Sequence, residues 1–259
     1  KKINSNYLTA YPETEQLYTV LAKKFKLNKE MFILTAGSDM AIRNCFELFV
    51  KPNDRIITLF PTYGMVDVYA KLYNCKQVKI KFGRKLKLNT KELMNKINSK
   101  TKLIIIANPN SPTGTIIKNN QLIEIFKKAQ KFNSYVLIDE AYYGFYKNTA
   151  LSFLKKFPNL IVSRSFSKAY GLAGCRVGML IANKTTAKRL YKFRPMYEIN
   201  SISVLVVKEM LENETILKKY IKETNLGKKY LIAVLDKLGF SYFDSYTNFL
   251  LVDFKTNKL

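Results

Sequence analysis

The segment Ser163–Asn183, which reads SRSFSKAYGLAGCRVGMLIAN, contains the residues with the clearest chemical potential. Lys168 stands beside two serines, Ser165 and Ser167, and Arg176 follows eight positions later. A lysine that forms a Schiff base with an aldehyde cofactor needs neighbours that hold the cofactor's phosphate, and two hydroxyls and a guanidinium suit that task. The spacing therefore predicts a covalent cofactor site. It leaves one alternative open, an exposed lysine in a glycine-bearing loop.

A carboxylate that would suit such a cofactor follows an apolar run. Asp139, in VLIDEAYYGF, comes directly after Tyr135–Ile138. A carboxylate in that place is costly to bury unless it meets a cation, and a protonated pyridine nitrogen is such a cation. The alternative is a strand-end aspartate that caps the next segment.

A possible phosphate cradle lies earlier in the chain. Ser38 and Asp39 follow the apolar run Phe32–Thr35 and precede a helical pattern at Met40–Phe49. Either residue suits a helix N-cap, which is a purely structural role. The first amides of a helix also attract phosphate, because they are unpaired and lie at the positive end of the helix dipole.

The elements that must position these residues alternate between strands and helices. The clearest helical pattern is Asn120–Phe132, and beyond Leu211 a charged helix at Glu212–Leu238 precedes short strands within Phe240–Phe254. Short apolar runs separated by helices favour a mainly parallel sheet covered on both faces, with functional residues in the loops at the carboxyl ends of its strands. The expected strands are Arg55–Phe60, Leu103–Ala107, Tyr135–Ile138, Leu160–Val162 and Val177–Ala182.

Composition excludes several kinds of function. With no histidine among 259 residues, a Ser-His-Asp triad, a Cys-His pair and a His-ligated metal are impossible, and we expect no metal site. Cys45, Cys75 and Cys175 are far apart and predict reduced thiols in a cytoplasmic protein. No apolar run is long enough for a membrane span, and no signal peptide is visible. The net charge of +25 would favour nucleic acid, but the lysines are spread along the whole chain, so we expect no nucleic-acid partner.

Several separated motifs occur in a family order that makes the sequence recognisable. From Tyr11 to about Phe254 the chain resembles the class I and II pyridoxal-phosphate (PLP) aminotransferases. It is most similar to the branch that holds histidinol-phosphate aminotransferases and threonine-phosphate decarboxylases. The resemblance implies PLP fold type I, the aspartate aminotransferase-like α/β fold, in which helices cover a mainly parallel mixed sheet. It places a large domain at residues 1–211 without the usual N-terminal arm, and the start of an incomplete small C-terminal domain at 212–259.

The resemblance also assigns roles to individual residues. Lys168 matches the Schiff-base lysine, Asp139 the partner of the ring nitrogen, and Tyr142 a donor to the cofactor's phenolate oxygen. Tyr63, in FPTYGM, matches the aromatic residue that stacks on the pyridine ring. The residues implied for the phosphate are Ser38, Asp39, Ser165, Ser167, Arg176 and, from the partner chain of a homodimer, Tyr11.

One loop departs from the family's pattern. Where the family usually has N-P-x-N-P-T-G, residues 108–114 read NPNSPTG, with Ser111 in place of the asparagine that contacts the phenolate oxygen. Because serine is shorter, we expect the neighbouring Asn110 to make this contact in preference to Ser111.

The sequence therefore predicts a PLP-dependent aminotransferase that acts on a small amino acid or amine, with or without a phosphate group. A second candidate is decarboxylation of a phosphorylated amino acid, since the resemblance gives both reactions the same cofactor residues. The candidate from a different class is a basic nucleic-acid-binding protein, which would bind its partner in a strongly salt-dependent way and carry no coloured cofactor.

Overall fold

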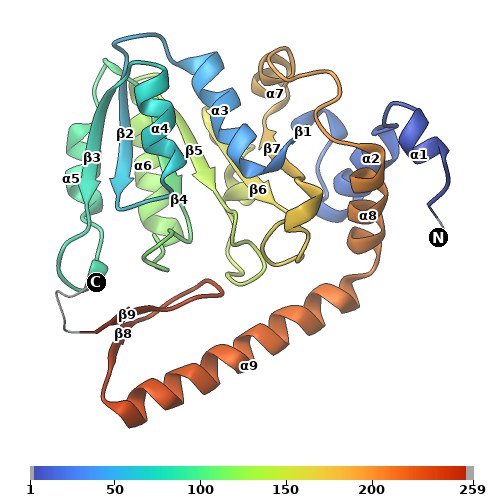
Figure 1. Cartoon of the computed structure of the whole chain (residues 1–259). Coiled ribbons are helices and arrows are strands. Elements are labelled where there is room, and N and C mark those ends of the chain that lie inside the picture. The colour runs from blue at the N-terminus through green and yellow to red at the C-terminus, as the bar shows by residue number, and fades with distance from the viewer. Residues whose placement is uncertain (1–2, 255–259) are drawn as a thin grey trace.

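A seven-stranded sheet organises most of the chain in the computed structural model, which describes residues 3–254 (Figure 1). Its strand order is β1-β7-β6-β5-β4-β2-β3, with β7 antiparallel to both neighbours and every other pair parallel. The sheet is therefore mixed but mainly parallel, as expected. The strands are β1 Phe32–Thr35, β2 Arg55–Phe60, β3 Lys76–Lys81, β4 Thr101–Ala107, β5 Tyr135–Asp139, β6 Leu160–Ser165 and β7 Gly178–Ala182.

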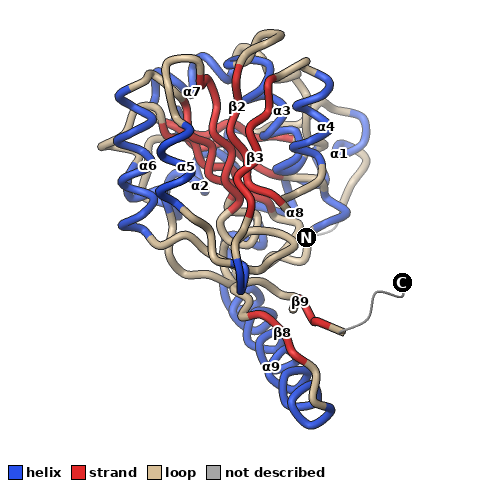
Figure 2. The backbone as a smooth tube through the Cα atoms, turned by 90° about the vertical axis from the view of Figure 1, so that its left-hand side faces the viewer, coloured by secondary structure: helices blue, strands red, loops and turns tan. Residues whose placement is uncertain are grey.

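Helices cover both faces of this sheet. Figure 2 shows α5 and α6 on one side and α3 and α4 on the other. The α3 side also receives buried residues of α7, and the α6 side receives those of α2 and α8. The helices are α2 Glu15–Phe25, α3 Gly37–Phe49, α4 Met65–Leu72, α5 Thr90–Lys96, α6 Asn119–Lys131, α7 Lys184–Tyr191 and α8 Ser201–Glu212, with a short α1 at Asn6–Thr9.

The central strands are apolar on both faces, which is why they read as continuous runs. Leu103 and Ile105 pack in the core cluster under α3 and α4, whereas Ile104 and Ile106 pack in the cluster under α6. Successive side chains of a strand point to opposite faces, so a strand with helices on both sides needs an apolar residue at every position.

The edge strand β3 does not follow that rule and is not among the strands expected from apolar runs. Its sequence is KQVKIK, and among its residues Ile80 alone is buried. An edge strand of a parallel sheet has one neighbour and tolerates charge. The four-residue β1 was also not predicted as a strand, although all four of its residues are buried.

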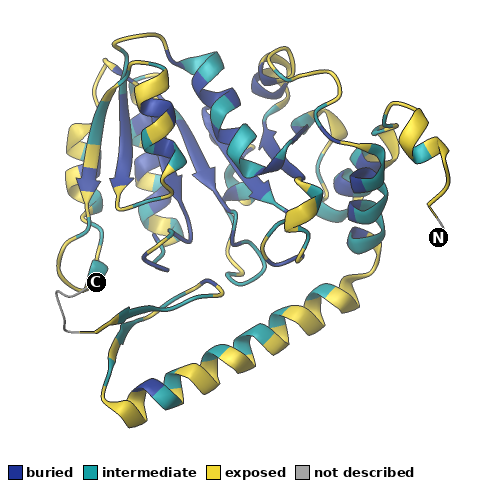
Figure 3. Ribbon diagram, viewed as in Figure 1, coloured by how far each residue is buried: buried dark blue, intermediate teal, exposed yellow. Residues whose placement is uncertain are grey.

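The C-terminal part leaves the sheet and lies below the carboxyl ends of its strands. Figure 1 shows α9 (Glu214–Leu238) running beneath the sheet, with the hairpin of β8 (Ser241–Phe243) and β9 (Leu251–Asp253) lying between them. Most of α9 is exposed, and of its residues Leu235 alone is buried (Figure 3). The helix expected from Glu212 begins two residues later, because Glu212 still belongs to α8. The domain boundary near residue 212 stays a prediction.

The described helices have no membrane-spanning character. No helix within residues 3–254, the 25-residue α9 included, is long and apolar enough to cross a membrane.

Candidate active site

A cavity of about 220 Å³ opens where β4, β5 and β6 end and α3 begins. In Figure 1 the arrowheads of β2 and β5 point towards this edge of the sheet. Larger hollows elsewhere on the surface contain none of the predicted site residues except Tyr11. The cavity is lined by Ser38, Asp39, Tyr63, Ala107, Pro109, Ser111, Asp139, Ala141, Tyr142, Ser165, Ser167, Lys168 and Arg176.

Asp139 supplies a buried carboxylate to the wall of the cavity. It is the last residue of β5, is 5% exposed, and accepts a 2.7 Å hydrogen bond on Oδ1 from the Ser163 hydroxyl of the neighbouring strand. Burial raises the pKa of Asp139 to about 6, although the Ser163 hydrogen bond and the charge of Lys168 oppose the rise. A cation placed against this carboxylate would favour its charged form. Asp139 thus fits the protonated nitrogen of a pyridine ring.

Groups that bind phosphate line the same cavity. The hydroxyls of Ser38, Ser165 and Ser167 and the guanidinium of Arg176 all line it, and Ser38 lies in the first turn of α3. The Ser165 hydroxyl accepts a 3.0 Å hydrogen bond from the Ser167 amide, which fixes the turn between them. The guanidinium of Arg176 and the first turn of α3, whose amides have no partner within the helix, are both suited to bind a phosphate in this cavity.

Two glycines permit this close arrangement. A Cβ on Gly37, whose φ is +79°, would lie 2.8 Å from Nη2 of Arg176, and a Cβ on Gly178 would lie 2.6 Å from the Ser38 amide nitrogen. Side chains at these positions would push the guanidinium and β7 away from the start of α3. The residues present therefore fit both ends of PLP, the ring nitrogen at Asp139 and the phosphate between Arg176 and α3.

Lys168 and Tyr142 lie close to each other in this site. The Nζ atom of Lys168 lies 5.5 Å from the centroid of the Tyr142 ring, and both residues line the cavity. Tyr142 is buried, and the edge of Phe249 from the β8–β9 loop packs against it with ring centroids 5.4 Å apart. The C-terminal hairpin thus reaches the wall of the cavity.

Tyr63 lies in the loop after β2 and reaches the cavity with its ring 39% exposed. Its hydroxyl donates a 3.3 Å hydrogen bond to the Asp39 carboxylate. Burial, and then the Asp39 charge, raises the pKa of Tyr63 to about 12, so the hydroxyl remains a donor at neutral pH.

The structure differs from the sequence expectation at Asn110. Its side chain is 1% exposed and does not line the cavity, whereas Ser111 does. Asn110 accepts a 2.8 Å hydrogen bond from the Thr62 hydroxyl and donates to the Pro61 carbonyl at 3.0 Å. These bonds hold the Asn110 amide between two loops, whereas Ser111 lines the cavity. Contact of either residue with a cofactor stays a prediction.

Tyr11 lies outside the cavity of its own chain. It is 72% exposed, its ring stacks on Tyr197 with centroids 4.0 Å apart, and it lines a separate hollow of about 580 Å³. Its expected contact with the phosphate of a partner chain therefore stays a prediction.

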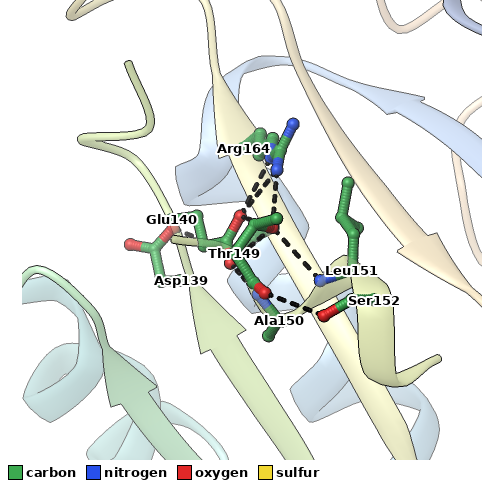
Figure 4. A network of polar contacts seen from close by, with 8 residues as sticks. Asp139, Glu140, Thr149, Ala150, Leu151, Ser152 and Arg164 are labelled. Atoms are coloured by element: carbon green, nitrogen blue, oxygen red, sulfur yellow. Dashed lines mark hydrogen bonds and ion pairs between the residues drawn. The ribbon is translucent and has the colours of Figure 1, made fainter. Parts of the chain in front are cut away.

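Sequence reasoning missed a buried ion pair directly behind the site. Arg164 of β6 and Glu140, one residue after Asp139, form an ion pair at 2.9 Å (Figure 4). Both side chains are at most 3% exposed. Thr149 donates to both carboxylate oxygens and accepts from Arg164 at 2.7 Å. The pair ties together the ends of the two strands that carry Asp139 and Ser165. The sequence does hold an indication of this ion pair. Arg164 lies inside the apolar run LIVSRS, and a buried arginine needs a buried partner.

We expect Arg164→Met to lower the free energy of unfolding by about 3–5 kcal/mol, because it leaves the buried Glu140 carboxylate without its counter-ion. Lys127→Met, which removes the exposed pair with Glu124, is the matched control and should change stability by less than about 0.5 kcal/mol. Urea unfolding measures both variants. Equal, small effects would show that the Arg164 pair does not stabilise the strand ends.

No group of three potential metal ligands among histidine, cysteine, aspartate and glutamate lies close together in the part of the chain that the structure describes.

Comparisons with known proteins agree on one family. The model of aminotransferases of class I and II matches residues 3–258. A histidinol-phosphate aminotransferase of Flavobacterium psychrophilum is 34% identical over 257 residues, which cover 96% of this chain and 72% of that protein. One from a Thermoanaerobacter species is 33% identical, over 98% of this chain and 72% of that protein.

Solved structures of the same enzyme class resemble the fold. The histidinol-phosphate aminotransferase of Clostridium acetobutylicum matches with a TM-score of 0.87 and 23% identity, over 95% of this chain and 75% of that chain. That of Sinorhizobium meliloti, in complex with pyridoxal-5'-phosphate, matches with a TM-score of 0.87 and 23% identity, over 96% of this chain and 69% of that chain. The aspartate aminotransferase of Thermus thermophilus, bound to maleate, matches with a TM-score of 0.85 and 20% identity, over 95% of this chain and 70% of that chain.

Proposed function

Because this chain belongs to the class I and II aminotransferase family and is thus a PLP-dependent aminotransferase, we propose that it takes the amino group from a small phosphorylated amine such as histidinol phosphate. The names of its relatives support this substrate class. The net charge of +25 also favours an anionic substrate. The observation that carries the catalytic part is a single cavity that holds Lys168, Asp139 and Arg176.

Asp139 holds the ring end of the cofactor. When bound, PLP supplies an electron sink for the bonds at the substrate's α-carbon, and the sink depends on a protonated ring nitrogen. The Asp139 carboxylate, fixed by Ser163, keeps that proton in place because the charged pair is buried and shielded from water.

Lys168 would hold the cofactor covalently through Nζ, and the same atom would carry the proton that moves between the reacting carbons. A side chain that first binds and then moves the proton must remain within reach of both reacting carbons. The rigid segment between β6 and β7, anchored at its start by the Ser165–Ser167 turn, keeps Lys168 in the cavity.

Arg176, Ser38, Ser165 and Ser167 hold the phosphate and so orient the ring against Asp139. Because these groups lie on different elements, α3 and the β6–β7 segment, the phosphate of the bound cofactor would also join those elements. Ser111 and Tyr142 line the same cavity, and their hydroxyls would serve as the hydrogen-bond partners of the cofactor's phenolate oxygen.

A comparison of four amino donors tests the substrate class. Histidinol phosphate, phosphoserine, threonine phosphate and glutamate are each offered to the PLP-loaded chain with 2-oxoglutarate or, for glutamate, another keto acid. We expect the highest rate of keto-product formation from histidinol phosphate. A higher rate from an amine without phosphate would contradict the proposed substrate class, and carbon dioxide released from threonine phosphate would identify a decarboxylase.

We also propose a homodimer in which Tyr11 completes the site of the partner chain. The exposed Tyr11–Tyr197 stack supports a role for this surface in assembly, because large exposed aromatic pairs are typical of interfaces.

Complementation tests the exchange of Tyr11. The variants Tyr11→Ala and Lys168→Ala should each have little activity alone, and mixed subunits should recover part of it, because one site of each heterodimer is intact. If subunit exchange is verified by mass and no activity returns, Tyr11 does not act across an interface.

A cytoplasmic location is proposed as well. Its support is that Cys45, Cys75 and Cys175 are all free thiols. Cell fractionation with an antibody against the chain tests it.

A further inference from the structure

The loop that carries Tyr63 is fixed at its backbone but not at its ring. Asn110 binds the Pro61 carbonyl and the Thr62 hydroxyl, which anchors the two residues before Tyr63. The Tyr63 side chain is 39% exposed, so packing alone does not determine the orientation of its ring. Its hydroxyl has one described partner on another element, the carboxylate of Asp39 at 3.3 Å.

The Asp39 carboxylate is itself held from behind. Tyr69, in the middle of α4, donates a 2.9 Å hydrogen bond to Oδ2 of Asp39, while Tyr63 donates to Oδ1. Tyr69 is 6% exposed and packs against Phe46 of α3 with ring centroids 5.8 Å apart. The buried Tyr69 thus fixes the carboxylate through Oδ2, and Oδ1 of the same carboxylate accepts from the partly exposed Tyr63.

The position of Asp39 has opposite consequences for the helix and for the bound phosphate. It lies in the first turn of α3, where a carboxylate interacts favourably with the helix dipole. It lies close to the predicted phosphate site as well, where a negative charge would repel the phosphate. The hydrogen bonds from Tyr63 and Tyr69 orient the Asp39 carboxylate towards these two tyrosines.

We propose that Asp39 is a positioning residue that holds the Tyr63 ring against the face of the bound cofactor ring, with Tyr69 fixing the Asp39 carboxylate. The proposal rests on the proposed function, because it requires PLP in this cavity. It assigns the Asp39 side chain a role that is distinct from the contribution of the α3 amides to phosphate binding.

The chain offers a closely matched pair of variants for the test. Tyr69→Phe removes the hydroxyl that fixes Asp39. Tyr73→Phe removes a hydroxyl at the end of the same helix that donates a 3.0 Å bond to Glu47 on α3. Both rings pack against Phe46, so loss of either hydroxyl should perturb the α3–α4 contact to a similar degree. The two variants differ in whether the carboxylate that they release faces the cavity.

The measurements are the dissociation constant of PLP from the apoprotein and the circular dichroism of the visible band, which reports how the bound ring is oriented. Tyr69→Phe should raise the dissociation constant by about two- to tenfold, the range that corresponds to a lost aromatic stack, and weaken the visible dichroism. Tyr73→Phe should leave both unchanged.

Asp39→Asn serves as a second variant with nearly the same shape. Asparagine has one acceptor oxygen where the carboxylate has two, so it cannot accept from Tyr63 at one oxygen and from Tyr69 at the other. We therefore expect it to change the visible dichroism in the same direction as Tyr69→Phe. If Tyr69→Phe and Asp39→Asn both match the wild type, or if Tyr73→Phe shows the same loss as Tyr69→Phe, the proposal is wrong. Wild-type chain that binds no PLP would instead overturn the proposed function itself.

Discussion

Replacing Asp139 with asparagine is expected to lower turnover by about 100- to 1,000-fold, the range for loss of one preorganised electrostatic group, while the chain still retains PLP. An amide has no charge with which to keep the ring nitrogen protonated, so the electron sink fails. The phosphate ligands and Lys168 are unchanged, and they still bind the cofactor.

The same substitution should stabilise the chain when no cofactor is bound. The pKa of Asp139 is raised from its ordinary value of 3.8 to about 6, so the folded state binds the proton more tightly than the unfolded state. The resulting stability is present below pH 4 and is lost as the pH rises through 6, which amounts to about 3 kcal/mol at most. Asparagine does not titrate and avoids this loss.

Two measurements check these linked expectations. Steady-state kinetics of the PLP-loaded protein should show the loss of turnover. Urea unfolding of the apoprotein should show Asp139→Asn to be more stable than the wild type at pH 8, with a smaller difference at pH 5. Near-native turnover in the variant would remove Asp139 from the mechanism, and an unchanged difference between the two pH values would contradict the origin assigned to its pKa.

Replacing Lys168 with alanine should abolish covalent attachment of PLP and reduce turnover by about 100- to 10,000-fold, because the residue both binds the cofactor and carries the proton. Lys147→Ala, at an exposed lysine beyond the site, is the control and should behave like the wild type. Absorbance spectra and rates of the two purified variants make the comparison. A Lys168→Ala variant that still forms a covalent adduct would place the attachment elsewhere.

The fold was predictable from the sequence to the extent that core strands are continuous apolar runs. The sequence indicated β2, β4, β5, β6 and β7, and the comparisons confirm PLP fold type I. The edge strand β3 and the short β1 were not predicted, because β3 is mostly polar and β1 has only four residues.

The sequence predicts those site residues whose type the chemistry requires. It does not predict which of two neighbouring residues faces the cavity when tertiary contacts determine the choice. Lys168, Asp139 and Arg176 were indicated by motif and spacing, and the structure brings them into one cavity. Whether Asn110 or Ser111 faces that cavity depends on hydrogen bonds between two loops far apart in the sequence. Such partners cannot be read from one sequence.

The side chain of Asp39 and the pair of Glu140 with Arg164 illustrate the same limit. Each makes its decisive contact with a residue at least 24 positions away. A sequence shows that a buried charge needs a partner, but the partner is identified by the packing of the strands and helices between them.

The most direct test of the central claim is to locate the lysine that carries PLP. Wild-type chain incubated with PLP is reduced with borohydride, digested and mapped by mass spectrometry. We expect a pyridoxyl group on Lys168 in the tryptic peptide of residues 165–176, because trypsin cleaves after Arg164 and Arg176 but not after the modified lysine. A pyridoxyl group found on a different lysine, with Lys168 unmodified, would contradict it.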